Sequence, residues 1–188
     1  MKKSEEELEI ESGWEVHPDR TVLETPVVTV KAGPVVCKRS GKKKDLYLFD
    51  FPDWVNVVAL TPEKEILLIR QYRYGSKRME LEIPGGMMNP DEHPIEAGCR
   101  ELLEETGFAG KNPQLIGRVC PNPAIQRNYC HTILVEDAVQ ISDPSFDDME
   151  DIECLLEPER QVLDRIKNGT IDHGLVLNAL MFYLSWRK

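Results

Sequence analysis

Three glutamates that lie close together in the sequence could bind a metal ion. Glu101, Glu104 and Glu105 fall on one side of a helix with the usual turn of about 100° per residue. The other side of this predicted helix carries the apolar residues Ile95, Cys99, Leu102 and Leu103. Like charges three or four residues apart repel by roughly a few tenths of a kcal/mol per pair. A hard divalent cation removes that repulsion, and oxygen donors without sulfur favour Mg2+ or Mn2+.

Glycine, proline and arginine residues lie at fixed distances from this acidic run. Pro94 suits the first turn of the helix, and Gly107 suits its C-terminal end. Upstream, Gly86 is followed by Glu92 and then by Arg100. An acidic face that is merely solvated does not require these glycines and this arginine. The spacing therefore favours a functional site.

The pattern resembles the signature of the Nudix hydrolases, G-x5-E-x7-R-E-U-x-E-E-x-G-U, in which U is apolar. Its fixed positions are occupied by Gly86, Glu92, Arg100, Glu101, Glu104, Glu105 and Gly107. The resemblance implies hydrolysis of a nucleoside diphosphate linked to another moiety (NDP-X), with Mg2+ as the metal and Mn2+ as its alternative. The products would be a nucleoside monophosphate and X-phosphate.

The glutamates of the signature have expected roles at the metal. A pyrophosphate repels an incoming water, so a cation must neutralise its charge and lower the pKa of that water. We expect Glu101 and Glu105 to bind the metal, with Glu104 completing the cluster or ordering a bound water. The carbonyl of Gly85 is a candidate further ligand, because glycines let the backbone pass close to the site.

The other signature residues are expected to support these ligands. By resemblance, Arg100 orients the glutamates through ion pairs, and Glu92 holds the loop before the helix. Gly86 and Gly107 are expected to be structural. The expected catalytic set is Arg100, Glu104, Glu105 and Glu150.

Glu150 enters this set through the acidic segment 147–153. The segment resembles a loop of ADP-ribose pyrophosphatases in which a glutamate helps to deprotonate the attacking water. Glu150 is therefore the expected general base, and Glu153 is the second choice. An acidic loop without a catalytic duty remains the alternative.

Residues upstream of the signature resemble the ADP-ribose and ADP-sugar pyrophosphatase branch of the family. The runs Gln71-Tyr72-Arg73 and Leu81-Glu82-Ile83-Pro84-Gly85-Gly86 are similar to its Q-x-R and E-x-P-A-G segments. The resemblance implies that Arg73 holds the pyrophosphate or ribose, which its forked guanidinium suits. It also implies that Glu82 lies near the substrate or the outer metal shell. Plain surface or strand roles for both residues remain open.

The residues after the signature bear on the identity of the X moiety. Pro123 matches a proline of the same branch and is an expected substrate contact, but the residues after it, 124–128, depart from the branch pattern. ADP-ribose or an ADP-sugar is the first expectation. NADH, GDP-mannose or another dinucleotide is the alternative. An alternative of another class is a regulatory Nudix domain that binds a nucleotide without catalysis.

The composition limits the expected binding partners and the expected cellular location. The formal net charge of −10 argues against nonspecific binding to nucleic acid or to an anionic membrane. The five cysteines are scattered without a C-x-x-C pair, which suggests reduced thiols and a cytoplasmic location. The acidic start has no apolar signal segment, and no run approaches a membrane-spanning length.

The elements that must position the site read as a mixture of strands and helices. Apolar runs at 55–60 and 66–69, with others at 116–119 and 131–135, predict strands, and 157–168 and 175–186 predict helices. Because the order lacks a strict βαβ alternation, we expect an α+β fold. The resemblance specifies a Nudix α/β/α sandwich with a mixed sheet over residues 55–188, behind a flexible acidic arm at 1–13.

Residues 14–54 predict a short antiparallel β unit in front of that domain. By resemblance, this unit forms a homodimer through its strands and contributes aromatic side chains to base binding. The candidates are Trp14, Tyr47, Phe49 and Trp54, for which core or sheet packing is the alternative. The basic run 38–44 is expected to form a solvated hairpin tip, with a phosphate or acidic-partner patch as the alternative.

Overall fold

The computed structural model describes residues 13–146 and 151–187. The chain folds into two compact units. The first unit runs to Pro52 and includes Asn122–Asn128, and the second comprises Asp53–Pro121 and Tyr129–Lys188. The sequence placed the division near residue 54 and assigned the segment 122–128 to the second part.

The first unit is an antiparallel β-sheet. Its strands are β1 (Trp14–Val16), β2 (Arg20–Glu24), β3 (Thr29–Cys37) and β4 (Lys43–Asp50). The long strand β3 pairs with each of the other three. Turn residues at 38–40 lie in the connection from β3 to β4, so the basic run does form the tip of a hairpin.

The second unit contains two sheets. The first has the order β8-β5-β10-β9 and consists of β8 (Gly85–Met87), β5 (Trp54–Ala59), β10 (Cys130–Gln140) and β9 (Phe108–Val119). It is mixed, because β5 and β10 are parallel while the other pairs are antiparallel. The second sheet has the order β11-β6-β7 and consists of β11 (Ile152–Pro158), β6 (Glu65–Arg73) and β7 (Arg78–Glu82).

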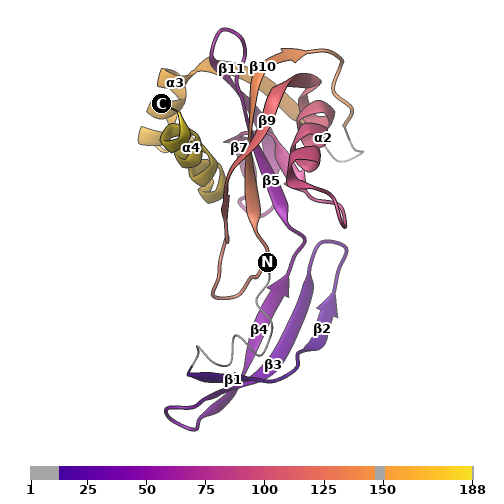
Figure 1. The fold of residues 1–188 in the computed structure, drawn as a ribbon, viewed down its shortest axis with the longest axis vertical. Helices are drawn as coiled ribbons and strands as arrows, with labels where there is room; N and C mark the ends of the chain where they lie inside the picture. Colours follow the sequence, from indigo (N-terminus) through magenta and orange to yellow (C-terminus); the bar gives the residue numbers. More distant parts are fainter. Residues whose placement is uncertain (1–12, 147–150, 188) are drawn as a thin grey trace. The chain divides into compact units, whose positions relative to one another are not determined.

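Helices cover both sides of these strands (Figure 1). On one side, α2 (Pro94–Thr106) packs Leu102 into a core with Val57 and Ile133. On the other side, α3 (Glu159–Lys167) and α4 (Gly174–Trp186) enclose a second core that includes Leu68, Val162 and Leu180. The predicted α+β sandwich with a mixed sheet is therefore confirmed.

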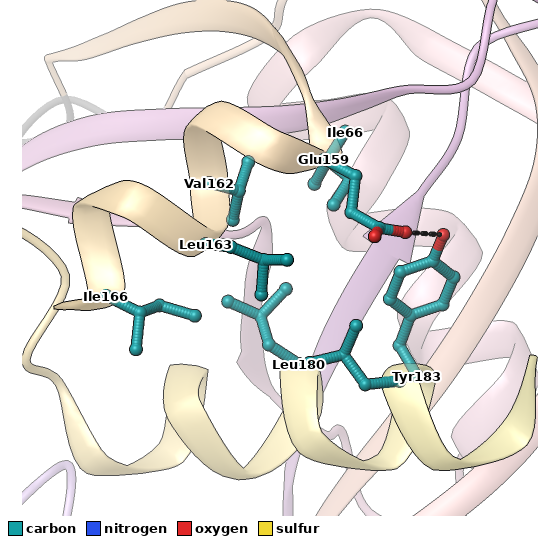
Figure 2. A pocket seen from close by; sticks show the side chains of 8 residues that line it. Ile66, Glu159, Val162, Leu163, Ile166, Leu180 and Tyr183 are labelled. Atoms are coloured by element: carbon teal, nitrogen blue, oxygen red, sulfur yellow. Dashed lines mark hydrogen bonds between the residues drawn. The ribbon is translucent and has the colours of Figure 1, made fainter.

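Helices α3 and α4 close tightly on each other. Figure 2 shows Val162, Leu163 and Leu180 filling the crevice between them, which has no room for a water molecule. The hydroxyl of Tyr183 donates to Glu159 Oε2 at 3.0 Å. The sequence placed the start of α3 at residue 157. It begins two residues later because Glu157 still pairs with Ile66 in the β11–β6 ladder.

None of the helices in the described part of the chain has the length and apolarity needed to cross a membrane.

Candidate active site

Helix α2 is fixed at both ends by local interactions. At its start, the ring Nδ1 of His93 accepts a hydrogen bond from the backbone N–H of Ile95 at 3.3 Å, and Pro94 occupies the first turn. At its end, Gly107 adopts a left-handed conformation with φ of 72° and donates its N–H to Leu103 O at 2.8 Å. These two ends set which glutamates belong to the last turn.

The orientation of α2 differs from the one expected from the sequence. Leu103 was assigned to the apolar back, but it is 38% exposed, whereas Glu105 of the acidic front is only 4% exposed. The reason is Gly98. A side chain at this position would meet Ile133 at 2.8 Å, so the helix approaches the sheet through its glycine. This contact turns Glu105 inward and Leu103 outward.

Arg100 lies at the centre of a network of carboxylates. Its guanidinium binds Glu92 in a bidentate pair, with Nε–Oε1 at 2.8 Å and Nη2–Oε2 at 2.9 Å. Its Nη1 donates to Glu101 Oε1 at 2.8 Å and to Glu104 Oε2 at 3.0 Å. Nη2 also reaches Met87 O at 3.2 Å, so Arg100 ties the preceding loop to the helix.

The same network sets the ionisation of Glu92. The hydrogen bonds from Arg100 are the main cause that lowers the pKa of Glu92 to about 2, and the backbone N–H of Asn89 adds to this effect. The pKa of Arg100 is raised in return, chiefly by Glu92. Both groups are therefore fully charged near neutral pH.

The glycine loop passes very close to the remaining carboxylates. The backbone N–H of Gly85 donates to Glu105 Oε2 at 2.9 Å. A Cβ on Gly86 would lie 2.6 Å from Glu101 Oε1, so any residue other than glycine would clash with this carboxylate. The glycine loop thus contacts helix α2 at both Glu101 and Glu105.

The side chains of Glu101, Glu104 and Glu105 offer only oxygen atoms as ligands, and such ligands fit a hard divalent cation. Within residues 13–146 and 151–187, however, no three His, Cys, Asp or Glu side chains stand ready to hold a metal ion. In this arrangement Arg100 binds Glu101 and Glu104, while Glu105 accepts a hydrogen bond from Gly85. An ionised carboxylate has about four lone-pair sites on its two oxygens, so each of these glutamates can keep its present contact and still bind a cation.

Arg73 and Glu82, which the sequence indicated as separate substrate contacts, form one ion pair. The Arg73 guanidinium donates from Nε to Oε1 at 3.0 Å and from Nη2 to Oε2 at 2.6 Å. His173 Nδ1 lies 3.4 Å from the same carboxylate. Burial alone would raise the pKa of Glu82, but the nearby His173 and Arg73 outweigh it and lower the pKa to about 2.

His173 is a neighbour of the site that the sequence did not indicate. It was expected to be structural or exposed, and it lies at the start of α4, far from Glu82 in the chain. No spacing rule links the two residues. Only the fold, which places the start of α4 next to Glu82 of β7, brings them together.

Pro123 belongs to the segment that folds with the first unit. There Arg127 binds Asp50 through Nε–Oδ1 at 2.8 Å and Nη2–Oδ2 at 2.6 Å, and the backbone N–H of Phe49 donates to Ile125 O at 2.8 Å. The pKa of Asp50 falls to about 2, with Arg127 as the main cause. The segment that follows Pro123 is thus anchored to β4.

The expected general base, Glu150, lies outside the described residues. The second choice, Glu153, is on β11 and pairs with Arg70 of β6. Its neighbour Cys154 has its sulfur 4.0 Å from the carbonyl oxygen of Glu105. Successive strand residues point to opposite faces, so the side chain of Glu153 lies on the face away from Glu105.

One further cavity lies in the first unit, with a volume of about 320 Å3. Trp14 and Leu46 line it together with Arg39, Lys42 and Lys44. The basic hairpin tip therefore adjoins one of the aromatic candidates for base binding.

Comparisons with known proteins find similarity in both sequence and fold. A family model described as NUDIX domain matches residues 50–176. An ADP-ribose pyrophosphatase of Bacillus subtilis (strain 168) is 32% identical over 98 residues, which cover 52% of this chain and about half (53%) of that relative. An ADP-sugar pyrophosphatase of Mus musculus is 27% identical over 185 residues, covering 94% of this chain and 82% of the relative. A solved structure of an ADP compounds hydrolase superposes with a TM-score of 0.82 at 21% identity, covering 93% of this chain and 94% of that one.

Proposed function

We propose, from the premise that this chain belongs to the NUDIX family, that it hydrolyses the pyrophosphate bond of an NDP-X substrate. The family membership rests on the match to the NUDIX family model, which spans more than half of the chain. The observation that carries the proposal is the network in which Arg100 gathers Glu92, Glu101 and Glu104 beside the Gly85–Glu105 contact. The products are a nucleoside monophosphate and X-phosphate.

Glu101, Glu104 and Glu105, with the carbonyl of Gly85, would hold the metal, for which we propose Mg2+ with Mn2+ as the alternative. When bound, such a cation neutralises the pyrophosphate charge and activates water. Arg100 positions Glu101 and Glu104 at 2.8 and 3.0 Å. Burial of Glu105 keeps its carboxylate away from bulk water, which strengthens its interaction with a cation.

We propose ADP-ribose or an ADP-sugar as the substrate. The names of the relatives from Bacillus subtilis and Mus musculus support this choice. The Arg73–Glu82 pair also supports it, because Glu82 fixes the guanidinium in one orientation on β6. A guanidinium held in this way is pre-organised for the oxygens of a phosphate or a ribose.

We further propose that the first unit mediates a homodimer and that the protein acts in the cytoplasm. The exposed apolar side chains Trp14, Val16, Val22 and Leu23 on β1 and β2 support the dimer, since such patches mark association surfaces. Sedimentation equilibrium of the full chain tests it. A monomer at all concentrations would contradict it.

The decisive experiment measures turnover by the purified protein with Mg2+. The panel contains ADP-ribose, ADP-glucose, GDP-mannose, NADH and dGTP, and the readout is the nucleotide product. We expect AMP from ADP-ribose or ADP-glucose, with no product when a chelator is present. Turnover of GDP-mannose or NADH alone would keep the reaction and change the substrate. Tight binding of one compound without metal-dependent turnover would instead favour a regulatory nucleotide-binding domain.

A further inference from the structure

One face of the β11-β6-β7 sheet carries a cluster of polar side chains. Gln71 and Arg73 are two residues apart on β6 and so point to the same face. Their neighbours Glu80 and Glu82 on β7 share that face, because Glu80 pairs with Gln71 and Glu82 with Ile69. Cys154, which also pairs with Ile69, contacts the carbonyl oxygen of Glu105. This face is therefore the one turned toward the end of α2.

The charges of this cluster are compensated by one another. Arg73 binds Glu82, as described above. Arg78 binds Glu80 through Nε–Oε1 at 2.8 Å and Asp172 through Nη2 at 2.7 Å. The two guanidinium groups thus face three carboxylates. A surface with this balance has no excess positive charge with which to attract a further phosphate.

Gln71 is the uncharged member of this cluster and takes part in none of these ion pairs. It is only 8% exposed, and among the described residues its amide Nε2 has no acceptor. Burying an amide N–H without a hydrogen bond is unfavourable, so a donor left in this state calls for an explanation. A bound ligand that supplies an oxygen is such an explanation.

We propose that Gln71 is a specificity-determining residue whose side-chain amide binds a hydroxyl group of the X moiety. This inference rests on the proposed function. A carboxamide both donates and accepts hydrogen bonds, as a hydroxyl does. Gln71 is uncharged, and the cluster around it is not cationic, so its partner is a sugar hydroxyl rather than a phosphate. Its place beside the Arg73–Glu82 pair puts it next to the expected substrate contacts.

The test replaces Gln71 with leucine, which has a similar size and no hydrogen-bonding group. The activity readout is kcat/KM for the NDP-sugar that the wild-type protein cleaves fastest and for the methyl ester of the same nucleoside diphosphate, which has no hydroxyl on X. We expect Gln71→Leu to lower kcat/KM for the NDP-sugar by about tenfold, the effect of one hydrogen bond, and to leave the methyl ester within about twofold.

A matched control and a stability measurement separate this role from a structural one. Gln161→Leu makes the same change at an exposed position on α3 and should alter neither value. The unfolding midpoint of Gln71→Leu should stay level or rise, because a donor without an acceptor is removed. Equal losses on both substrates, no loss on either, or a lowered midpoint would overturn the proposal.

Binding measurements keep this inference distinct from the proposed function. If the wild-type protein cleaves nothing in the panel, the proposed hydrolysis fails. Calorimetric titration of ADP-ribose without added metal then compares wild type, Gln71→Leu and Gln161→Leu. Weaker binding in Gln71→Leu alone supports the hydroxyl contact. Equal binding by all three, or no binding by the wild type, overturns it.

Discussion

Glu105 combines burial with a direct contact to the glycine loop. Its Oε2 accepts the N–H of Gly85, and its side chain lies against the sheet. In Glu105→Gln, the amide oxygen can still accept that hydrogen bond, so the fold should hold while the charge for the metal is lost. We expect kcat to fall by several orders of magnitude with little change in the unfolding midpoint.

A matched control for this change lies on the same helix. Glu96 is exposed in the first turn of α2, so Glu96→Gln should leave kcat within about twofold, as surface substitutions usually do. Both variants are assayed with saturating Mg2+ and the best substrate. Turnover by Glu105→Gln at the wild-type rate would place the metal elsewhere.

Glu82 makes the fold sensitive to acid. Its pKa of about 2 in the folded protein lies below the ordinary value of 4.5. The folded state therefore binds this proton less readily than the unfolded state. The resulting stabilisation is complete above about pH 4.5 and is lost as the pH falls toward 2. Glu82→Gln should lower the free energy of unfolding at pH 7 by about 3 kcal/mol and weaken its dependence on pH in that window.

The pair between Glu153 and Arg70 provides the comparison for Glu82. It also joins a glutamate to an arginine of β6, but both side chains are about half exposed. Glu153→Gln should therefore cost less than about 1 kcal/mol. Urea unfolding at pH 7 and pH 3 measures both variants. Similar costs at pH 7 would show that burial does not strengthen the Arg73–Glu82 pair.

At the scale of elements, alanine substitutions at two glycines with positive φ can separate the cost of backbone strain from the cost of a steric clash. Gly107 ends α2 with φ of 72°, and Gly169 follows α3 with φ of 78°. A Cβ on Gly107 would lie 2.0 Å from the carbonyl oxygen of Ser142, whereas nothing lies within 4 Å of one on Gly169. Gly169→Ala should cost about 1 kcal/mol of strain alone, and Gly107→Ala more than about 2 kcal/mol.

Chemical unfolding of the two alanine variants checks this difference. Gly107→Ala should also reduce turnover, because a displaced last turn moves Glu104 and Glu105. Gly169→Ala keeps the wild-type rate, since it changes no contact of α2. Equal losses of stability in both variants would contradict the steric argument.

The sequence predicted the ends of α2 but not its orientation. Pro94 and Gly107 act locally, so their effect can be read from neighbouring residues. The rotation that buries Glu105 depends on the contact of Gly98 with Ile133, which lies on β10. Hydrophobic periodicity counts side chains and gives no weight to a glycine, so it placed Leu103 on the wrong side.

In the candidate site, too, contacts within one helix were predictable, whereas contacts between separate segments were not. The Arg100 network lies within one loop and one helix. The spacing predicted that Arg100 lies beside Glu104, and the resemblance implied its ion pairs with glutamates, but the bidentate pair with Glu92 was not predicted. The pair of Arg73 with Glu82 crosses a hairpin, and His173 reaches it from α4. Those contacts depend on the β6–β7 pairing and on where the chain enters α4. The sequence therefore indicated two of these residues as separate substrate contacts and did not indicate the third.

At the scale of the whole molecule, the first unit is not a continuous stretch of chain. Asn122–Asn128, which connects β9 to β10 in sequence, folds with β4. Hydrophobic patterns did not reveal this, because the segment contains no periodic run. A ladder of contacts fixes it instead: Ile125 O accepts from Phe49, Arg127 binds Asp50, and Asn128 donates to Pro52 O at 3.1 Å.

Arg127 and Asp50 should therefore act as one unit. Arg127→Ala and Asp50→Ala each remove the bidentate pair, so each should speed amide exchange in the segment 122–128 and at Phe49. The double variant should be little worse than Asp50→Ala alone, with a coupling of about 1 kcal/mol because Arg127 is half exposed. Lys31 also binds Asp50, at 2.5 Å, so Asp50→Ala should be the costlier single change.

Hydrogen exchange followed by mass spectrometry measures these rates. If the effects of the two single changes simply added, the segment would be held by its backbone contacts and not by the ion pair.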